Sequence, residues 1–174
     1  MRGDRAVYNT LSADEAKLIV VIRGFLDRGT ADASGPADDP LRELIEVPLI
    51  QFISFLWRAD PYVVKLNQRD DPVVTLFELQ VLYAISEARG ESEVTVDELL
   101  AWWLPQDLIE TGRASLITIA RLLNDFGMDQ QSSDRLREQI LETSFNRGKS
   151  KRIYELDSPV SDPLNTKSTI QTLH

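Results

Sequence analysis

The chain contains no cysteine and a single histidine, and both absences restrict its chemistry. Without cysteine it can form no disulfide, no thiolate metal site and no cysteine nucleophile. The one histidine, His174, ends a segment without periodicity, whereas a catalytic or metal-binding imidazole must be held in place. Zinc, copper and Glu-x-x-His di-metal sites are therefore not expected. We predict no cofactor and no metal.

A long hydrophobic run is also missing. The most apolar segment, Val47–Trp57, is interrupted by Gln51 and Ser54. A helix of that length covers about 16 Å of a bilayer core that is about 30 Å thick. The short apolar run Leu18–Ile22 sits among charged residues and does not resemble a secretion signal. We expect no contact with a membrane and a cytoplasmic location.

Basic residues are in the minority, with 19 lysines and arginines against 28 acidic residues and a net charge of −9. This balance opposes general affinity for nucleic acid, which requires cations to replace phosphate counterions. The sequence also has no Gly-rich phosphate loop and no Gly-x-Ser-x-Gly elbow. An enzyme that uses carboxylates, serine, lysine or tyrosine is the third functional interpretation, after two non-catalytic ones.

Apolar periodicity and helix-start signals predict a mostly α-helical fold. Predicted helices cover residues 12–27, 39–59, 72–89, 95–105, 114–126 and 133–147. Residues 94–96 are predicted to form a short strand, and residues 61–67 are compatible with either helix or strand. We therefore predict a single-domain helical bundle of about six helices over residues 1–156, with at most one short β element. A flexible C-terminal tail is predicted for residues 157–174.

Local signals set the predicted helix ends. Ser12 and Glu15 have the spacing of a capping box, and Gly29 is placed to cap the end of that helix. Asp39 followed by Pro40 is a helix start, and Asp71 followed by Pro72 repeats the signal. The helix that follows Pro72 is predicted to be the core helix because of its many apolar residues.

The order of elements within residues 77–128 resembles a winged helix-turn-helix. A helix, a short β-prone stretch, a capped helix, a connection and a second helix follow one another there. In that family the third helix enters the major groove and a β-hairpin wing touches the DNA backbone. The resemblance implies that Ser115, Thr118 and Arg121 face DNA, with Lys149, Lys151 and Arg152 near a wing. A DNA-binding regulator is therefore the second interpretation of function.

The favoured interpretation is a non-catalytic protein that binds a protein partner or associates with itself. The helix after Asp39 carries apolar residues on a second side, which include Val47, Ile50 and Trp57. Trp102 lies at the edge of the apolar stripe of its helix, while Trp103 is expected in the core. Exposed tryptophans are frequent interface anchors. The predicted partner-binding residues are therefore Val47, Ile50, Trp57 and Trp102, although burial under a neighbouring helix would also explain the two tryptophans.

Overall fold

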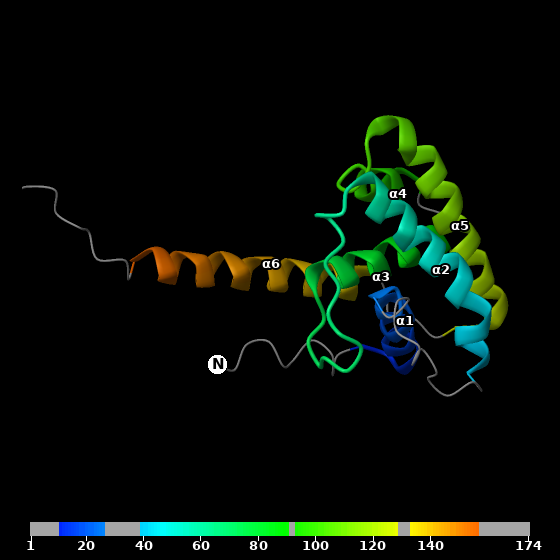
Figure 1. Cartoon of the computed structure of the whole chain (residues 1–174), viewed down its shortest axis with the longest axis horizontal. Coiled ribbons are helices and arrows are strands. Elements are labelled where there is room, and N and C mark those ends of the chain that lie inside the picture. Colours follow the sequence, from blue (N-terminus) through cyan, green and yellow to red (C-terminus); the bar gives the residue numbers. More distant parts are fainter. Residues whose placement is uncertain (1–10, 27–38, 91–92, 129–132, 157–174) are drawn as a thin grey trace, which may run out of the picture.

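A computed structural model describes residues 11–26, 39–90, 93–128 and 133–156, with the backbone alone for Glu93 and for residues 145–156. Within these ranges the chain forms six α-helices, the short 3₁₀ helix η3 and no strand. The elements are α1 (Ala13–Arg23), α2 (Pro40–Ala59), α3 (Leu76–Arg89), α4 (Glu93–Leu100), η3 (Gln106–Leu108), α5 (Ile109–Phe126) and α6 (Ser133–Leu156), as Figure 1 shows. The predicted mostly α-helical bundle of about six helices is confirmed.

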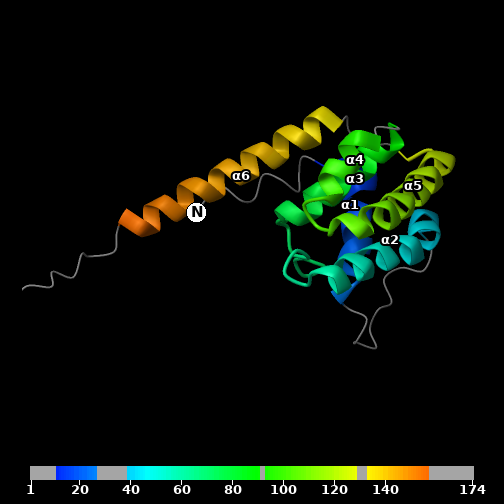
Figure 2. The ribbon, with the colours of Figure 1, turned by 90° about the horizontal axis from the view of Figure 1, so that it is seen from above.

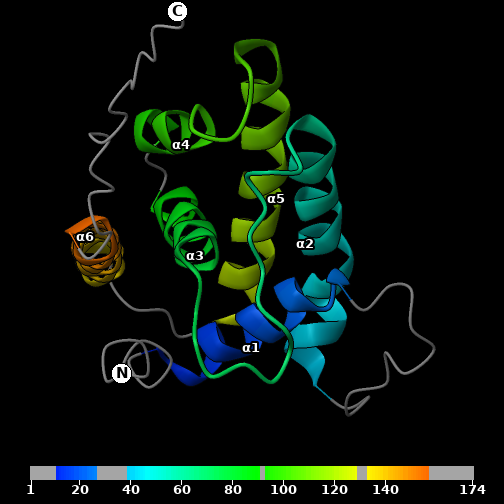
Figure 3. The same cartoon turned by 60° about the vertical axis from the view of Figure 1, so that its left-hand side comes forward.

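The helices pack around α3 and α5. Helix α5 contacts both α2 and α3, while α1 contacts α2 and α3, and α4 packs against α3 and α5 (Figure 3). Helix α6 begins along α3, and its C-terminal half then extends away from the other helices (Figures 1 and 2). The predicted core role of α3 is confirmed because it contacts α1, α4, α5 and α6. Its buried residues are Phe77, Glu78, Leu79, Val81, Leu82, Ala84, Ile85 and Ala88.

Two predicted helix starts are confirmed in atomic detail. The Ser12 backbone N–H donates to Glu15 Oε2 at 2.8 Å, and the Glu15 N–H donates to Ser12 Oγ at 3.2 Å. Asp39 Oδ1 accepts from the N–H of Leu41 at 3.1 Å, with Pro40 in the first turn of α2. The end of α1 differs, because the helix stops at Arg23, earlier than predicted. Gly29, the predicted cap, lies outside the described residues.

Helix α3 does not begin at Pro72. Asp71 instead makes a local turn in which its Oδ1 accepts from the Val73 N–H at 2.8 Å. The helix begins after Thr75, which forms a capping box with Glu78. Residues 61–67, left open between helix and strand, form a turn followed by irregular backbone. This segment is tied to the start of α3, because the Asn67 N–H donates to Glu78 Oε1 and the Lys65 carbonyl accepts from the Thr75 hydroxyl.

The predicted strand at residues 94–96 is wrong, because this stretch belongs to α4. Val96, Leu99 and Leu100 have helical spacing and are all buried. Tertiary packing thus outweighs the β propensity of the valines and threonine. Helix α4 ends at Leu100, five residues before the predicted Pro105, and tight turns follow, with the N–H of Trp103 donating to the carbonyl of Leu100 at 2.9 Å.

Helix α5 begins at Ile109, and Gly112 lies inside it rather than before it. A Cβ at Gly112 would lie 2.7 Å from Leu104 Cδ1 and 3.1 Å from Leu100 Cδ2, so a larger residue would force these buried leucine side chains to shift. Gly127 ends the helix as predicted, with a left-handed φ of 75°. Phe126, the last residue of α5, is 40% exposed.

Helix α6 is longer than predicted and runs through Gly148 to Leu156. The basic stretch at residues 147–152 is therefore helical. Leu136 and Ile140 are buried as expected, whereas Leu141 is exposed. The predicted tail, residues 157–174, lies outside the described residues, so the domain boundary at 156 stays a prediction.

Candidate interaction surface

The structure separates the four predicted partner-binding residues. Val47, Trp57 and Trp102 are 60%, 42% and 61% exposed. Ile50 is only 1% exposed, so its predicted role is wrong. The buried arc of α2 is wider around Ile50 than the apolar stripe indicated, since Leu49, Phe52 and Ile53 beside it are buried too.

Trp102 is the most exposed of the three tryptophans. The Trp57 ring packs against Phe25, with ring centroids 5.8 Å apart, so one side of it already has a partner. Val47 and Trp57 are both on α2, about 15 Å apart along its axis at about 1.5 Å per residue. Trp103 is 5% exposed and packs on Phe77, which confirms its predicted place in the core.

A surface hollow of about 420 Å³ lies between α4 and the start of α5, next to Trp102 in the sequence. Its lining residues are Asp97, Glu98, Ala101, Gln106, Ile109, Glu110 and Arg113. Arg113 Nε donates to Asp97 Oδ1 at 2.7 Å, and this ion pair joins the two helices. Glu98 and Glu110 are exposed, while Ile109 supplies a buried apolar wall.

The segment around this hollow is strongly acidic. Residues 93–110, which we call the α4–α5 edge, contain five acidic residues and no lysine or arginine. Two exposed apolar side chains, Val94 and Trp102, belong to the same segment. Exposed apolar side chains and exposed carboxylates thus belong to one segment, which suits a partner that carries both cationic and apolar groups.

Sequence reasoning identified Trp102 but missed the hollow. The predicted strand at residues 94–96 and the predicted helix start at Ala114 obscured how Asp97 and Arg113 meet. The available signal was that residues 93–110 contain five acidic residues and no basic residue. Such a segment indicates a charged surface, but only the packing of α4 on α5 produces a concave one.

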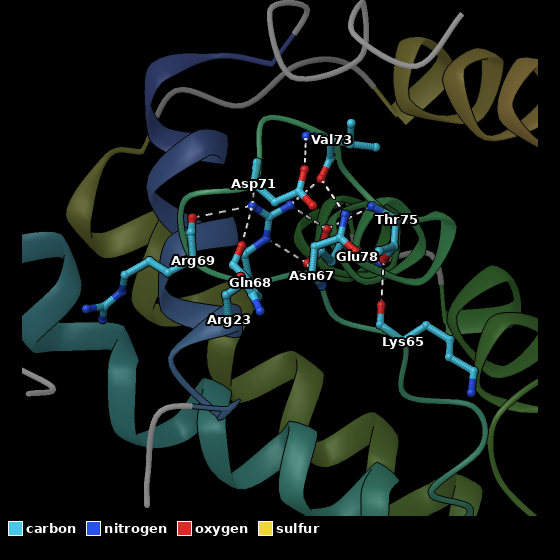
Figure 4. A network of polar contacts seen from close by, with 9 residues as sticks. All are labelled: Arg23, Lys65, Asn67, Gln68, Arg69, Asp71, Val73, Thr75 and Glu78. Carbon is cyan, nitrogen blue, oxygen red and sulfur yellow. Dashed lines mark hydrogen bonds and ion pairs between the residues drawn. The ribbon is translucent and has the colours of Figure 1, made fainter. Parts of the chain in front are cut away.

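A buried ion pair at the centre of a network of polar contacts lies elsewhere in the molecule (Figure 4). Arg23, at the end of α1, donates from Nε to Glu78 Oε1 at 2.8 Å and from Nη2 to Glu78 Oε2 at 2.9 Å. Both side chains are 0% exposed. The remaining guanidinium contacts go to the carbonyls of Gln68, Arg69, Asp71 and Val73, at 3.2, 3.4, 2.6 and 2.6 Å.

Glu78 is satisfied from a second direction. Its Oε1 also accepts from the Asn67 N–H at 3.1 Å, and its Oε2 from the Thr75 N–H at 2.8 Å. The Thr75 hydroxyl in turn donates to the Lys65 carbonyl at 2.6 Å (Figure 4). All five guanidinium donors and both carboxylate oxygens are thereby used. The arrangement fixes the loop before α3 and leaves no donor directed at a ligand.

A second hollow of about 640 Å³ borders this loop and is lined by Leu26, Gln68, Arg69, Asp70 and Asp71. The backbone carbonyls of three of these residues are engaged by Arg23. This hollow is therefore shaped by the buried network.

A titratable group with a shifted pKa lies at the contact between α3 and α6. Burial raises the pKa of the Tyr83 phenol, and the charge of Glu87 together with its hydrogen bond to Tyr83 raises it further. From α6, the charge of Asp134 also raises it, while that of Arg137 lowers it. No local sequence pattern indicates this cluster, because it depends on how α6 lies on α3.

The residues of the DNA-binding interpretation do not form a winged helix-turn-helix. Lys149, Lys151 and Arg152 lie on α6, where a β-hairpin wing was expected, and the described residues contain no strand. On α5, Thr118 and Arg121 are exposed and Ser115 is half-buried. The hydroxyls of Ser115 and Thr118 donate to carbonyls of their own helix at 3.0 and 2.9 Å.

The part of the chain that the structure describes contains no group of three or more His, Cys, Asp or Glu side chains with the arrangement of a metal site. None of the helices in this part of the chain has the length and apolar composition that crossing a bilayer requires.

Comparison with known proteins gives no match: no protein-family model fits the chain, and neither the curated proteins nor the solved structures contain a significant relative.

Proposed function

We propose that this protein is a non-catalytic interaction domain and that the α4–α5 edge is its binding surface. The observation that carries the proposal is Trp102, which is 61% exposed and adjoins the acidic hollow in sequence. Large aromatic side chains at the centre of a desolvated patch are typical binding hot spots. A cytoplasmic location belongs to the proposal, supported by a cysteine-free sequence that needs no oxidising compartment.

The exposed part of Trp102 is large enough to matter energetically. An aromatic side chain buries about 150–250 Å² in total, so the exposed part of this indole amounts to about 120 Å². At about 25 cal/mol per Å², covering it contributes about 3 kcal/mol to binding. That equals about a hundredfold in affinity, before the entropic cost of ordering the side chain.

Charge defines the partner further. The α4–α5 edge contains five acidic residues and no lysine or arginine, so it attracts a cationic surface and repels an acidic one. Glu98 and Glu110 are exposed and can pair with such a partner, whereas Asp97 is already paired with Arg113. We therefore expect a basic protein segment that places an apolar side chain against Trp102.

Photo-crosslinking in cells tests the proposal. Benzoylphenylalanine replaces Trp102 in one variant and Tyr62, which is 81% exposed, in the control. We expect protein adducts from position 102 that are absent from position 62 and that disappear when Glu98→Lys and Glu110→Lys are added. The same adducts from both positions, or adducts that survive the charge reversals, would refute the binding surface.

A further inference from the structure

The same chain carries a segment with the charge that the α4–α5 edge lacks. Four of its 19 lysines and arginines fall within residues 147–152, a stretch without any acidic residue. The segment lies in the C-terminal half of α6. Residues 147 and 151 are spaced i, i+4 and residues 149 and 152 are spaced i, i+3, so each pair lies close together on the helix surface. We call residues 147–152 the basic segment.

Helix α6 presents this segment away from its own domain. Its N-terminal half packs on α3 through Leu136 and Ile140, which are buried. Its C-terminal half leads away from α4 and from the other helices of the described residues (Figures 1 and 2). With 24 residues, α6 spans about 36 Å at about 1.5 Å per residue. The basic segment is thus held at a distance from the α4–α5 edge of the same molecule.

Helices gain most of their stability from tertiary packing, so the projecting half of α6 lacks the support that the other helices have. A partner that packs against it would supply that support. Because the segment is basic, a partner with an acidic surface would also gain charge-charge attraction. The α4–α5 edge of another copy offers such a surface, together with the exposed Trp102.

We propose that the protein associates with itself, the basic segment of one copy docking on the α4–α5 edge of the other. The proposal rests on the proposed function, and it names a second copy of this chain as the partner. Four cationic residues would meet an edge whose exposed carboxylates are Glu98, Asp107 and Glu110. Two copies related by a twofold axis can make this contact twice, which closes a dimer and satisfies both surfaces.

Charge reversal with complementation tests the contact by analytical ultracentrifugation of the full chain. One variant carries Lys149→Glu, Lys151→Glu and Arg152→Glu in the basic segment. The other carries Glu98→Lys, Asp107→Lys and Glu110→Lys, three exposed positions on the α4–α5 edge. We expect the wild type to dimerise at low salt and to dissociate as salt rises. Each variant alone should show a dimer Kd raised at least about tenfold.

An equimolar mixture of the two variants should restore the dimer. The reversed segment of one variant then meets the reversed edge of the other, and the remaining wild-type segment and edge also match. A control carries Arg58→Glu, Lys65→Glu and Arg121→Glu at exposed positions outside both surfaces. Its net charge changes by the same amount as that of the basic-segment variant. This control should dimerise like the wild type, because its two docking surfaces are unchanged.

Three results would overturn the proposal. They are a wild type that is monomeric up to hundreds of micromolar at low salt, a dimer that survives both reversals, and a mixture that stays monomeric. A mixed-sequence DNA duplex is added in a separate arm. Binding of the duplex by a monomeric wild type, lost with the Lys149→Glu variant set, would assign the basic segment to nucleic acid instead. If crosslinks from position 102 to another protein persist while dimerisation fails, the proposed function stands and this inference falls.

Discussion

Replacing Arg23 by methionine tests whether the buried network holds the fold together. Methionine is unbranched and uncharged and reaches about as far as the arginine Nε, so Arg23→Met removes the guanidinium while keeping most of the aliphatic stem. Glu78 would keep only the N–H groups of Asn67 and Thr75 as donors. The four loop carbonyls that accept from Arg23 would lose that donor.

The cost follows from the burial of both partners. Removing one member of a buried ion pair costs about 3–5 kcal/mol, because the other charge stays buried without compensation. Both side chains here are 0% exposed, and the loop carbonyls add their own loss, so we expect about 5 kcal/mol. That is a large part of the 5–15 kcal/mol by which domains are typically stable. The variant should unfold at a much lower urea concentration.

The double variant Arg23→Met/Glu78→Leu separates charge from packing. It removes both charges, so it should be more stable than the sum of the single effects indicates, by about 3 kcal/mol. Urea unfolding followed by circular dichroism measures the stability of Arg23→Met, Glu78→Leu and the double variant. The matched control is Arg113→Met. Arg113 Nε lies 2.7 Å from Asp97 Oδ1, close to the 2.8 Å between Arg23 Nε and Glu78 Oε1, but the Arg113–Asp97 pair is about one-third exposed. We expect about 0–1 kcal/mol for the control. An Arg23→Met effect no larger than that of the control would refute the reasoning.

Three further changes address the fold in other places. Gly112→Ala should destabilise the protein by about 1 kcal/mol in urea unfolding, because contact with the buried Leu104 side chain outweighs the helix propensity that alanine adds. Thr75→Ala should cost about 1–2 kcal/mol in the same assay, since it removes the N-cap of α3 and a hydrogen bond to the 60–75 loop. Because the folded pKa of Tyr83 is raised, stability should be fully present below pH 10.0 and fall as the pH rises through the folded value. Tyr83→Phe should flatten this alkaline decline in thermal unfolding, whereas an unchanged decline would contradict the burial of the phenol beside Glu87.

Helix ends were predictable where one local signal acted without competition. Ser12 with Glu15, and Asp39 with Pro40, each bring their own donors and acceptors within a few residues. The start of α3 was missed although Thr75 and Glu78 also have the spacing of a capping box. The competing Asp-Pro signal four residues earlier makes a turn instead. Two helix-start motifs therefore follow one another, Asp71-Pro72 and the capping box of Thr75 with Glu78. The buried ion pair of Glu78 with Arg23 favours the capping box as the start of α3.

Predictions that depended on distant residues failed more often. Residues 94–96 have β propensity, but Val96 packs at helical spacing with Leu99 and Leu100. The helix over residues 114–126 was predicted to begin after Gly112, yet this glycine lies within α5 at a close approach to Leu104. A sequence shows that a glycine is present, but not which neighbour requires the space. Whether Gly112 is a breaker or a contact point is settled only by packing.

The candidate surface was predictable in part for the same reason. Val47, Trp57 and Trp102 lie off the main apolar stripes and are exposed, although the sequence was equally compatible with burial of the two tryptophans. The burial of Ile50 was not predictable, because the width of a buried arc depends on what packs against the helix. The pairing of Arg23 with Glu78 joins residues 55 positions apart, and nothing in either local sequence indicates the other.

Stability and binding are carried by different parts of the molecule, and this makes the proposals separable. The buried network joins the end of α1, the loop before α3 and the first turn of α3 (Figure 4). The α4–α5 edge and the basic segment contribute no residue to it. Arg23→Met should therefore lower the free energy of unfolding while leaving the dimer Kd of the folded molecules unchanged. The charge reversals should raise the dimer Kd while leaving the free energy of unfolding unchanged. The reversed residues of the edge are exposed, and their carboxylates support no buried group. A variant set that shifted both quantities together would show that the two regions are coupled, and the assignment of the edge as an independent docking surface would fail.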